Sequence, residues 1–136
     1  MRFLLDNNVL SELRKGARCA PKVRRWFDAQ NDEDIRISVI TLGEISAGIA
    51  QIALRDSTQA QHLELWLSQM KKNFAGSILP VTEDIADCWG RLSPRERLPA
   101  ADALIAATAL QHGLTVVTRN VADFERSGAR ILNPWE

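Results

Sequence analysis

Short apolar runs alternate with helical patterns along the whole chain, and this alternation restricts the fold more than any other feature. The runs that predict strands cover residues 3–5, 35–40, 78–81, 114–117 and 130–132. Between them, apolar residues recur at the spacing of one helix face. Strands that alternate with helices form parallel sheets covered on both faces. The sequence therefore predicts an α/β protein, a three-layer α/β/α sandwich with a central, mainly parallel sheet.

Helix boundaries are indicated by capping residues, glycines and prolines. We expect helices over residues 9–13, 23–27, 41–53, 63–70, 82–89, 99–112 and 120–126, and a polar loop over 91–98. Thr41 and Glu44 match the capping-box pattern at the start of the third helix. Gly113 should end the sixth helix. Pro80 predicts that its strand lies at a sheet edge, because proline cannot donate to a neighbouring strand.

Composition limits the class of protein. At 136 residues the chain should form a single domain, residues 1–136. Its formal net charge is zero, so composition alone gives no argument for nucleic acid. Cys19 and Cys88 are far apart and outside any CxxC spacing, which indicates a reducing compartment without a zinc site or disulfide. No signal peptide is visible and no apolar stretch approaches the ~20 residues of a membrane span, so we expect a cytoplasmic protein that does not contact membranes.

Four carboxylates lie where an apolar run gives way to a helix. They are Asp6, Glu44, Asp102 and Asp123. The carboxyl ends of parallel strands share one edge of a sheet, so these acids should converge there. Converging carboxylates repel one another, and a divalent cation relieves the repulsion. A site made only of hard oxygen ligands suits Mg²⁺ or Mn²⁺.

Each of these acids also has a purely structural interpretation. A carboxylate at a turn or in the first turn of a helix accepts from free backbone N–H groups and favours the helix dipole. Glu44 in particular would be the capping-box partner of Thr41. Glu83 and Asp84 hold the same topological position without further support. Placement alone therefore does not distinguish a site residue from a helix-start residue.

Four segments around the acids carry a family resemblance. They are residues 4–13 (LLDNNVLSEL), 41–44 (TLGE), 101–109 (ADALIAATA) and 118–124 (TRNVADF). In this order and spacing they resemble the PIN-domain family, and within it the VapC-type toxin ribonucleases. The closing Asn133-Pro134-Trp135 is also similar to members of that group.

The resemblance implies a PIN-like fold and a toxin–antitoxin function. The expected activity is that of an endoribonuclease that depends on Mg²⁺ or Mn²⁺ and hydrolyses RNA phosphodiester bonds with a metal-activated water. The expected partners are a cognate antitoxin protein and the RNA substrate. A homodimer, within a larger toxin–antitoxin assembly, is the expected oligomeric form.

The resemblance also assigns roles to individual acids. Asp6, Glu44 and Asp102 match the three invariant acids of the family. The fourth acid varies in place among members, at the position of Asn120 or at that of Asp123. Because the first position here is an amide, Asp123 is expected to contribute the fourth carboxylate, with Asn120 as a neutral supporting ligand.

Three polar residues complete the expected site. Asn8 matches the family's usual asparagine, and Thr118 supplies the usual hydroxyl near the fourth acid. Asn7 departs from the pattern, since the family most often has threonine or serine there. The departure removes a hydroxyl that would orient substrate or a ligating water.

Two other functions remain open from the residues alone. One is a PIN-fold binding module that engages RNA or a partner protein without catalysis; loss of a core acid would favour it. The other is a phosphoaspartyl enzyme or receiver with Asp6 as nucleophile. That chemistry normally needs a second aspartate two residues later, where this chain has Asn8.

The remaining candidates have weaker support. His62 and His112 lack metal-ligand spacing and are expected at the surface or at a helix end. A basic stretch could contact RNA phosphates or form a solvated face; it consists of Arg14, Lys15, Arg18, Lys22, Arg24 and Arg25. An apolar helix stripe suits the core or a dimer surface, and by resemblance an antitoxin groove; it consists of Leu63, Trp66, Leu67 and Met70.

Overall fold

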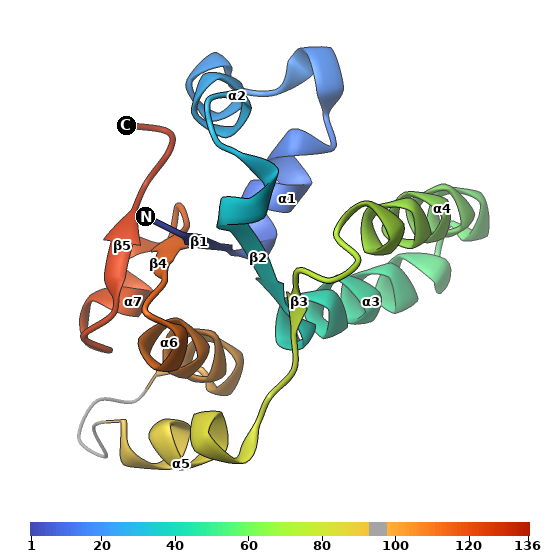
Figure 1. Cartoon of the computed structure of the whole chain (residues 1–136). Helices are drawn as coiled ribbons and strands as arrows, with labels where there is room; N and C mark the ends of the chain where they lie inside the picture. The colour runs from blue at the N-terminus through green and yellow to red at the C-terminus, as the bar shows by residue number, and fades with distance from the viewer. Residues whose placement is uncertain (93–97) are drawn as a thin grey trace.

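A parallel sheet lies at the centre of the computed structural model, which describes residues 1–92 and 98–136 (Figure 1). Five strands appear in these residues, in the order β3-β2-β1-β4-β5. They are β1 (Phe3–Leu5), β2 (Ile35–Ser38), β3 (Ile78–Leu79), β4 (Thr115–Val117) and β5 (Arg130–Leu132). Each neighbouring pair is parallel, so the α/β prediction is confirmed with a sheet that is parallel throughout. The strand before Pro80 is an edge strand, as expected.

Helices connect the strands and cover both faces of the sheet (Figure 1). They are α1 (Asn7–Leu13), α2 (Pro21–Asp28), α3 (Val39–Ala53), α4 (Ser57–Asn73), α5 (Glu83–Arg91), α6 (Ala100–His112) and α7 (Val121–Glu125). The expected loop over 91–98 lies mostly outside the described residues, and Arg91 belongs to α5. Pro99 is the N-cap of α6, one position before the first turn.

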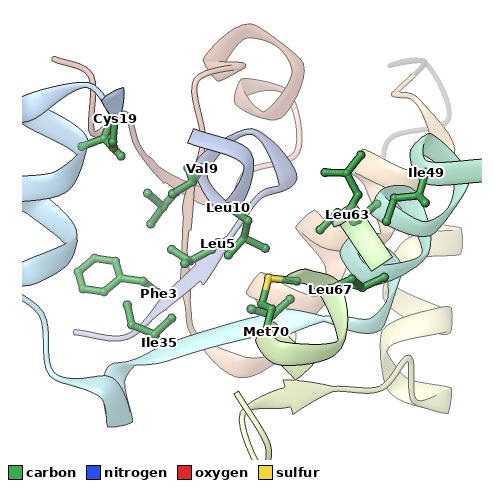
Figure 2. Packing of buried hydrophobic residues seen from close by; sticks show 14 of the residues in the cluster. Phe3, Leu5, Val9, Leu10, Cys19, Ile35, Ile49, Leu63, Leu67 and Met70 are labelled. Atoms are coloured by element: carbon green, nitrogen blue, oxygen red, sulfur yellow. The ribbon is translucent and has the colours of Figure 1, made fainter. Parts of the chain in front are cut away.

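The side chains of β1 alternate between two hydrophobic clusters. Phe3 and Leu5 pack on one face with residues of α1 to α4 (Figure 2). Leu4 packs on the other face with Ile105 of α6 and Phe124 of α7. Because successive residues of a strand point to opposite faces, a strand that is apolar at every position must be covered twice. This explains the three layers.

The start of α3 differs from the sequence prediction. Ser38 is the N-cap, and its Oγ accepts a hydrogen bond of 3.0 Å from the backbone N–H of Ile40. The strand therefore ends at Ser38, and the prediction of a strand to residue 40 with a cap at Thr41 was wrong. Thr41 is buried, and its Oγ has no partner among the described residues. Glu44 consequently lies in the second turn of α3 and is not a capping-box residue.

Within the described ranges, no helix combines the length and the apolar character needed to cross a membrane. Both cysteines are free thiols; Cys19 is buried and Cys88 is half-buried.

Gly113 ends α6 in the left-handed conformation, with φ of 66°, as its position in the sequence predicts. A Cβ at this position would meet no atom within 4 Å. The cost of a side chain here is therefore conformational strain and not a clash.

We expect Gly113→Ala to lower the free energy of unfolding by about 1 kcal/mol, the cost of a left-handed alanine. Gly48 is the matched control, because it lies inside α3 and its Cβ position is equally open. Gly48→Ala should raise the free energy of unfolding by roughly 0.5–1 kcal/mol. Urea unfolding of both variants measures the difference, and effects of the same sign would contradict this account of Gly113.

Candidate active site

Asp6 occupies the turn between β1 and α1 at the carboxyl edge of the sheet. Its backbone N–H donates to the carbonyl of Val117 on β4 (3.0 Å), which extends the β1–β4 pairing by one residue. Its side chain caps α1, with Oδ1 accepting from the N–H of Asn7 (2.8 Å). Only 4% of the residue is exposed. Asp6 is thus a carboxylate held below the surface by the strand that precedes it.

The second oxygen of Asp6 is held by residues from both ends of the chain. Thr118 Oγ1 donates to Asp6 Oδ2 at 2.8 Å, and Asn8 Nδ2 donates to the same oxygen at 3.3 Å. Asn8 Nδ2 also lies 3.2 Å from Thr118 Oγ1. These donors favour the ionised form and lower the pKa of Asp6. Burial is the larger effect and raises the pKa, and the negative charge of Asp123 raises it further.

Glu44 projects from the second turn of α3 toward the same edge. Its Oε1 is buried and has no hydrogen-bond partner among the described residues. Burial raises the pKa of Glu44, and the charges of Asp6 and Asp102 raise it further. An unpartnered carboxylate oxygen in a partly buried position is costly, so this side chain is not explained by its local structure.

Asp102 is the third residue of α6 and is half-buried. Burial raises its pKa from the usual 3.8 to about 6, and the charges of Asp6 and Asp123 contribute. A helix N-terminus alone would stabilise the charge and lower the pKa. Burial and the neighbouring carboxylates act in the opposite direction and raise the pKa of Asp102.

The two residues considered for the fourth ligand are placed differently. Asn120 is the N-cap residue of α7 and lines the cavity beside Asp6 and Asp102. Asp123 is exposed, in the first turn of α7, and acts on both of those acids through its charge. Among the described residues, the cavity lining includes Asn120 and not Asp123.

A cavity of about 330 Å³ joins these side chains. It is lined by Asp6, Asn7, Asn8, Ser11, Glu44, Asp102 and Asn120. Asp6, Glu44 and Asp102 come from three separate segments, so the cavity brings together three of the four acids that were expected to converge; Asp123 is not in its lining. Each lining residue that the structure describes carries a side-chain oxygen, and none of these is aromatic or aliphatic.

The chemistry of this cavity fits a hard divalent cation. The donors are carboxylate, amide and hydroxyl oxygens, and the free Oε1 of Glu44 is available as a ligand. As placed here, no three His, Cys, Asp or Glu side chains in the described part of the chain form a closed metal-binding group. A single ion shared by all three acids would therefore require the carboxylates to move closer together. Their mutual repulsion is the force that such an ion would remove.

The other candidates from the sequence do not enter the cavity. His62 and His112 are exposed on α4 and at the end of α6. In the basic stretch, Lys15 pairs with Glu12 at 3.1 Å and Arg24 with Asp28 at 3.5 Å. The guanidinium of Arg14 lies 5.8 Å from the centre of the Trp66 ring.

Two residues at the site were not singled out from the sequence. Ser11 lines the cavity, and its Oγ donates to Oδ1 of Asn7 at 3.1 Å. The spacing of four residues on one helix face was the available signal. Arg119 contributes its backbone N–H, which donates to Oδ1 of Asn8 at 3.2 Å. No local pattern connects residues so far apart in the chain.

Comparison with known proteins gives the family. The model described as "PIN domain" matches residues 3–128. The VapC ribonuclease Y4jK of Sinorhizobium fredii is 36% identical, with 98% of this chain and 98% of that protein covered. The crystal structure of FitAcB from Neisseria gonorrhoeae superposes with a TM-score of 0.87 and 35% identity, over 98% of this chain and 99% of the other. A toxin–antitoxin complex from Klebsiella pneumoniae superposes with a TM-score of 0.69 and 30% identity, over 98% of each chain.

These matches extend over almost the full length of the chain, and the span that the family model matches contains the positions of all four acids. The wholly parallel sheet and its acidic carboxyl edge agree with them. The chain belongs to the PIN-domain family.

Proposed function

We propose that this protein is a metal-dependent endoribonuclease, the toxin of a toxin–antitoxin pair, which acts on RNA in the cytoplasm. The convergence of Asp6, Glu44 and Asp102 in one oxygen-lined cavity is the observation that carries this proposal. Similarity to a VapC ribonuclease supports the reaction, and similarity to a toxin–antitoxin complex supports the biological setting.

In the proposed mechanism, Asp6 and Asp102 would hold Mg²⁺ or Mn²⁺, with Glu44, Asn120 and Asp123 assisting. A bound ion would polarise a phosphoryl oxygen and make a coordinated water acidic enough to attack phosphorus near neutral pH. Glu44 is suited to orient that water, because its Oε1 has no hydrogen-bond partner in residues 1–92 and 98–136. Asp123, from the rim, adds negative charge that strengthens cation binding without occupying the cavity.

Asn8 and Thr118 support the reaction by fixing Asp6. Their hydrogen bonds to Oδ2 hold the carboxylate in one orientation, so less freedom is lost when a cation binds. Asn7 and Ser11 place an amide and a hydroxyl at the cavity wall, where they can contact the substrate. Ser11, one helical turn after Asn7, thus supplies a hydroxyl in place of the one that the family most often carries at position 7.

A groove beside the active site suits the antitoxin. A cavity of about 230 Å³ lies between α1, α2 and α4, and apolar side chains dominate its lining: Leu10, Leu13, Phe27, Trp66, Met70 and Phe74. Amphipathic helices bind in grooves of this kind. We assign this groove to a helix of the antitoxin, within an assembly built on a toxin homodimer.

A substitution in the acid cluster distinguishes a catalytic site from one that only binds RNA. We expect Glu44→Gln to lower the rate of RNA cleavage by ~10²-fold or more, the typical loss when a positioned proton-transfer group is removed. The free energy of unfolding without metal should hold or rise, because a like-charge repulsion is removed. Gel-based cleavage of a structured RNA at saturating Mn²⁺, with protein free of antitoxin, measures the rate.

The control for this experiment is Glu83→Gln. Glu83 is the exposed first residue of α5. Like the site acids, it was singled out in the sequence because it follows an apolar run at the start of a helix. The Glu83→Gln variant should cleave RNA at the wild-type rate. If Glu44→Gln cleaves equally well, Glu44 has no catalytic role; if the wild type binds RNA and does not cleave it, the chain is a binding module.

The raised pKa of Asp102 predicts how stability depends on pH. Between pH 3.8 and about 6, the folded chain keeps a proton that the unfolded chain has lost. The free energy of unfolding therefore falls as pH rises through this window and stays reduced above it. Asp102→Asn removes the penalty, and after allowance for solvent screening it should stabilise the protein by about 1–2 kcal/mol at neutral pH.

Urea unfolding at about pH 4 and about pH 7.5 tests this, because most of the stabilisation should be lost at the lower value. Added Mn²⁺ should stabilise the wild type through mass action and the variant much less. If Mn²⁺ stabilises the wild type and Asp102→Asn equally, Asp102 does not contribute to the metal site.

The groove is tested by truncating Trp66. We expect Trp66→Ala to weaken antitoxin binding by at least about 2 kcal/mol, or roughly 30-fold in Kd, as for buried aromatic contacts at other interfaces. Leu65→Ala is the control, since Leu65 is the preceding residue on α4, is 71% exposed and does not line the groove. Calorimetric titration with the protein encoded by the adjacent reading frame measures both. Equal Kd values for the two variants would place the antitoxin elsewhere.

A further inference from the structure

The C-terminal segment folds back toward the active site. After β5, Asn133 Oδ1 accepts from the N–H of Trp135 at 3.0 Å, and the N–H of Glu136 donates to the carbonyl of Asn133 at 3.2 Å. This turn places Trp135 half-buried against the hydrophobic cluster that contains Phe3 and Leu5. The end of the chain is therefore fixed to the core.

Trp135 also contacts the loop between β4 and α7. The guanidinium of Arg119 lies 5.1 Å from the centre of the Trp135 ring, a cation–π distance. Arg119 is exposed, and its positive charge also helps to lower the pKa of Glu12. It lies directly between Thr118 and Asn120, which support or line the cavity. Its side chain is held by Trp135 on one side while its backbone faces the acid cluster.

The backbone of Arg119 completes a series of hydrogen bonds that ends at Asp6. Its N–H donates to Oδ1 of Asn8 at 3.2 Å, and this bond orients the Asn8 amide so that Nδ2 faces Asp6 Oδ2 and Thr118 Oγ1. If the loop moved away, Asn8 would lose its acceptor contact. Asp6 would then keep only part of the hydrogen bonding that fixes its carboxylate.

We propose that Trp135 is a positioning residue for the active site: by holding Arg119, it keeps the β4–α7 loop where Asn8 orients Asp6 for metal binding. This role rests on the proposed metal-dependent function of the same site. Neither Trp135 nor the Arg119 side chain touches the cavity, so neither is a catalytic residue.

The test compares Trp135→Leu with Trp135→Phe, and Arg119→Met with Arg119→Lys. The leucine and methionine variants remove the cation–π contact, whereas phenylalanine keeps an aromatic face and lysine keeps the charge. In the full-length protein we expect the Mn²⁺ Kd of Trp135→Leu and Arg119→Met to rise by about 10-fold, the lower end of the range for residues that support a metal ligand. The Mn²⁺ Kd of Trp135→Phe and Arg119→Lys should stay closer to the wild-type value. The double variant that combines Trp135→Leu with Arg119→Met should bind Mn²⁺ no more weakly than either single variant.

A second readout does not depend on metal or activity. Amide hydrogen exchange of Arg119 should accelerate in both disruptive variants, because the bond to Asn8 is weakened. If Arg119→Met keeps the wild-type amide exchange rate at position 119 and the wild-type Mn²⁺ Kd, the proposal is overturned. Additive losses of Mn²⁺ affinity in the double variant would also overturn it. If Trp135→Leu fails to fold, Arg119→Met decides the question, since its side chain is exposed. A wild type that binds Mn²⁺ but cleaves no RNA contradicts the proposed function and leaves this inference standing.

Discussion

Repulsion among carboxylates at one edge of the sheet is the constraint on which the site depends. Asp6, Glu44 and Asp102 each have a raised pKa, and in each case burial is the leading cause, with neighbouring negative charge adding to it. A folded chain accepts such a cluster only where the surrounding structure is stable enough to hold it. The double coverage of β1 provides that stability, because the strand leading to Asp6 is buried on both faces.

The cluster also explains why the polar residues around it are arranged as they are. Asp6 is held by three hydrogen-bond donors, whereas one oxygen of Glu44 has no partner in the part of the chain that the structure describes. The first acid is thus fixed before any ligand arrives, and the second remains available to respond to one. Such a division suits a site in which one carboxylate anchors a cation and another handles a water.

Much of this architecture could be predicted from the sequence, because it follows from local rules. Apolar runs and helical spacing located the elements. The common edge of parallel strands predicted that four acids would meet; Asp6, Glu44 and Asp102 line one cavity, and Asp123 is not in its lining. The cap of α3 was misplaced because Ser38 and Thr41 are both good N-cap residues, and only the observed strand end chooses between them. The contacts of Asn8 with Thr118 and Arg119 span 110 and 111 residues, and no local pattern encodes them.

The distance in sequence between Asp6 and its partners has a consequence for synthesis. β1 pairs with β4, and Asp6 receives its Thr118 hydrogen bond only after β4 has been made. While the C-terminal residues are still inside the ribosome, the emerging chain lacks both the strand beside β1 and the hydroxyl that holds Asp6. Under the proposed function, RNA cleavage would require β4 and Thr118 to be made and folded against β1, so the site cannot take its described form before that point of synthesis.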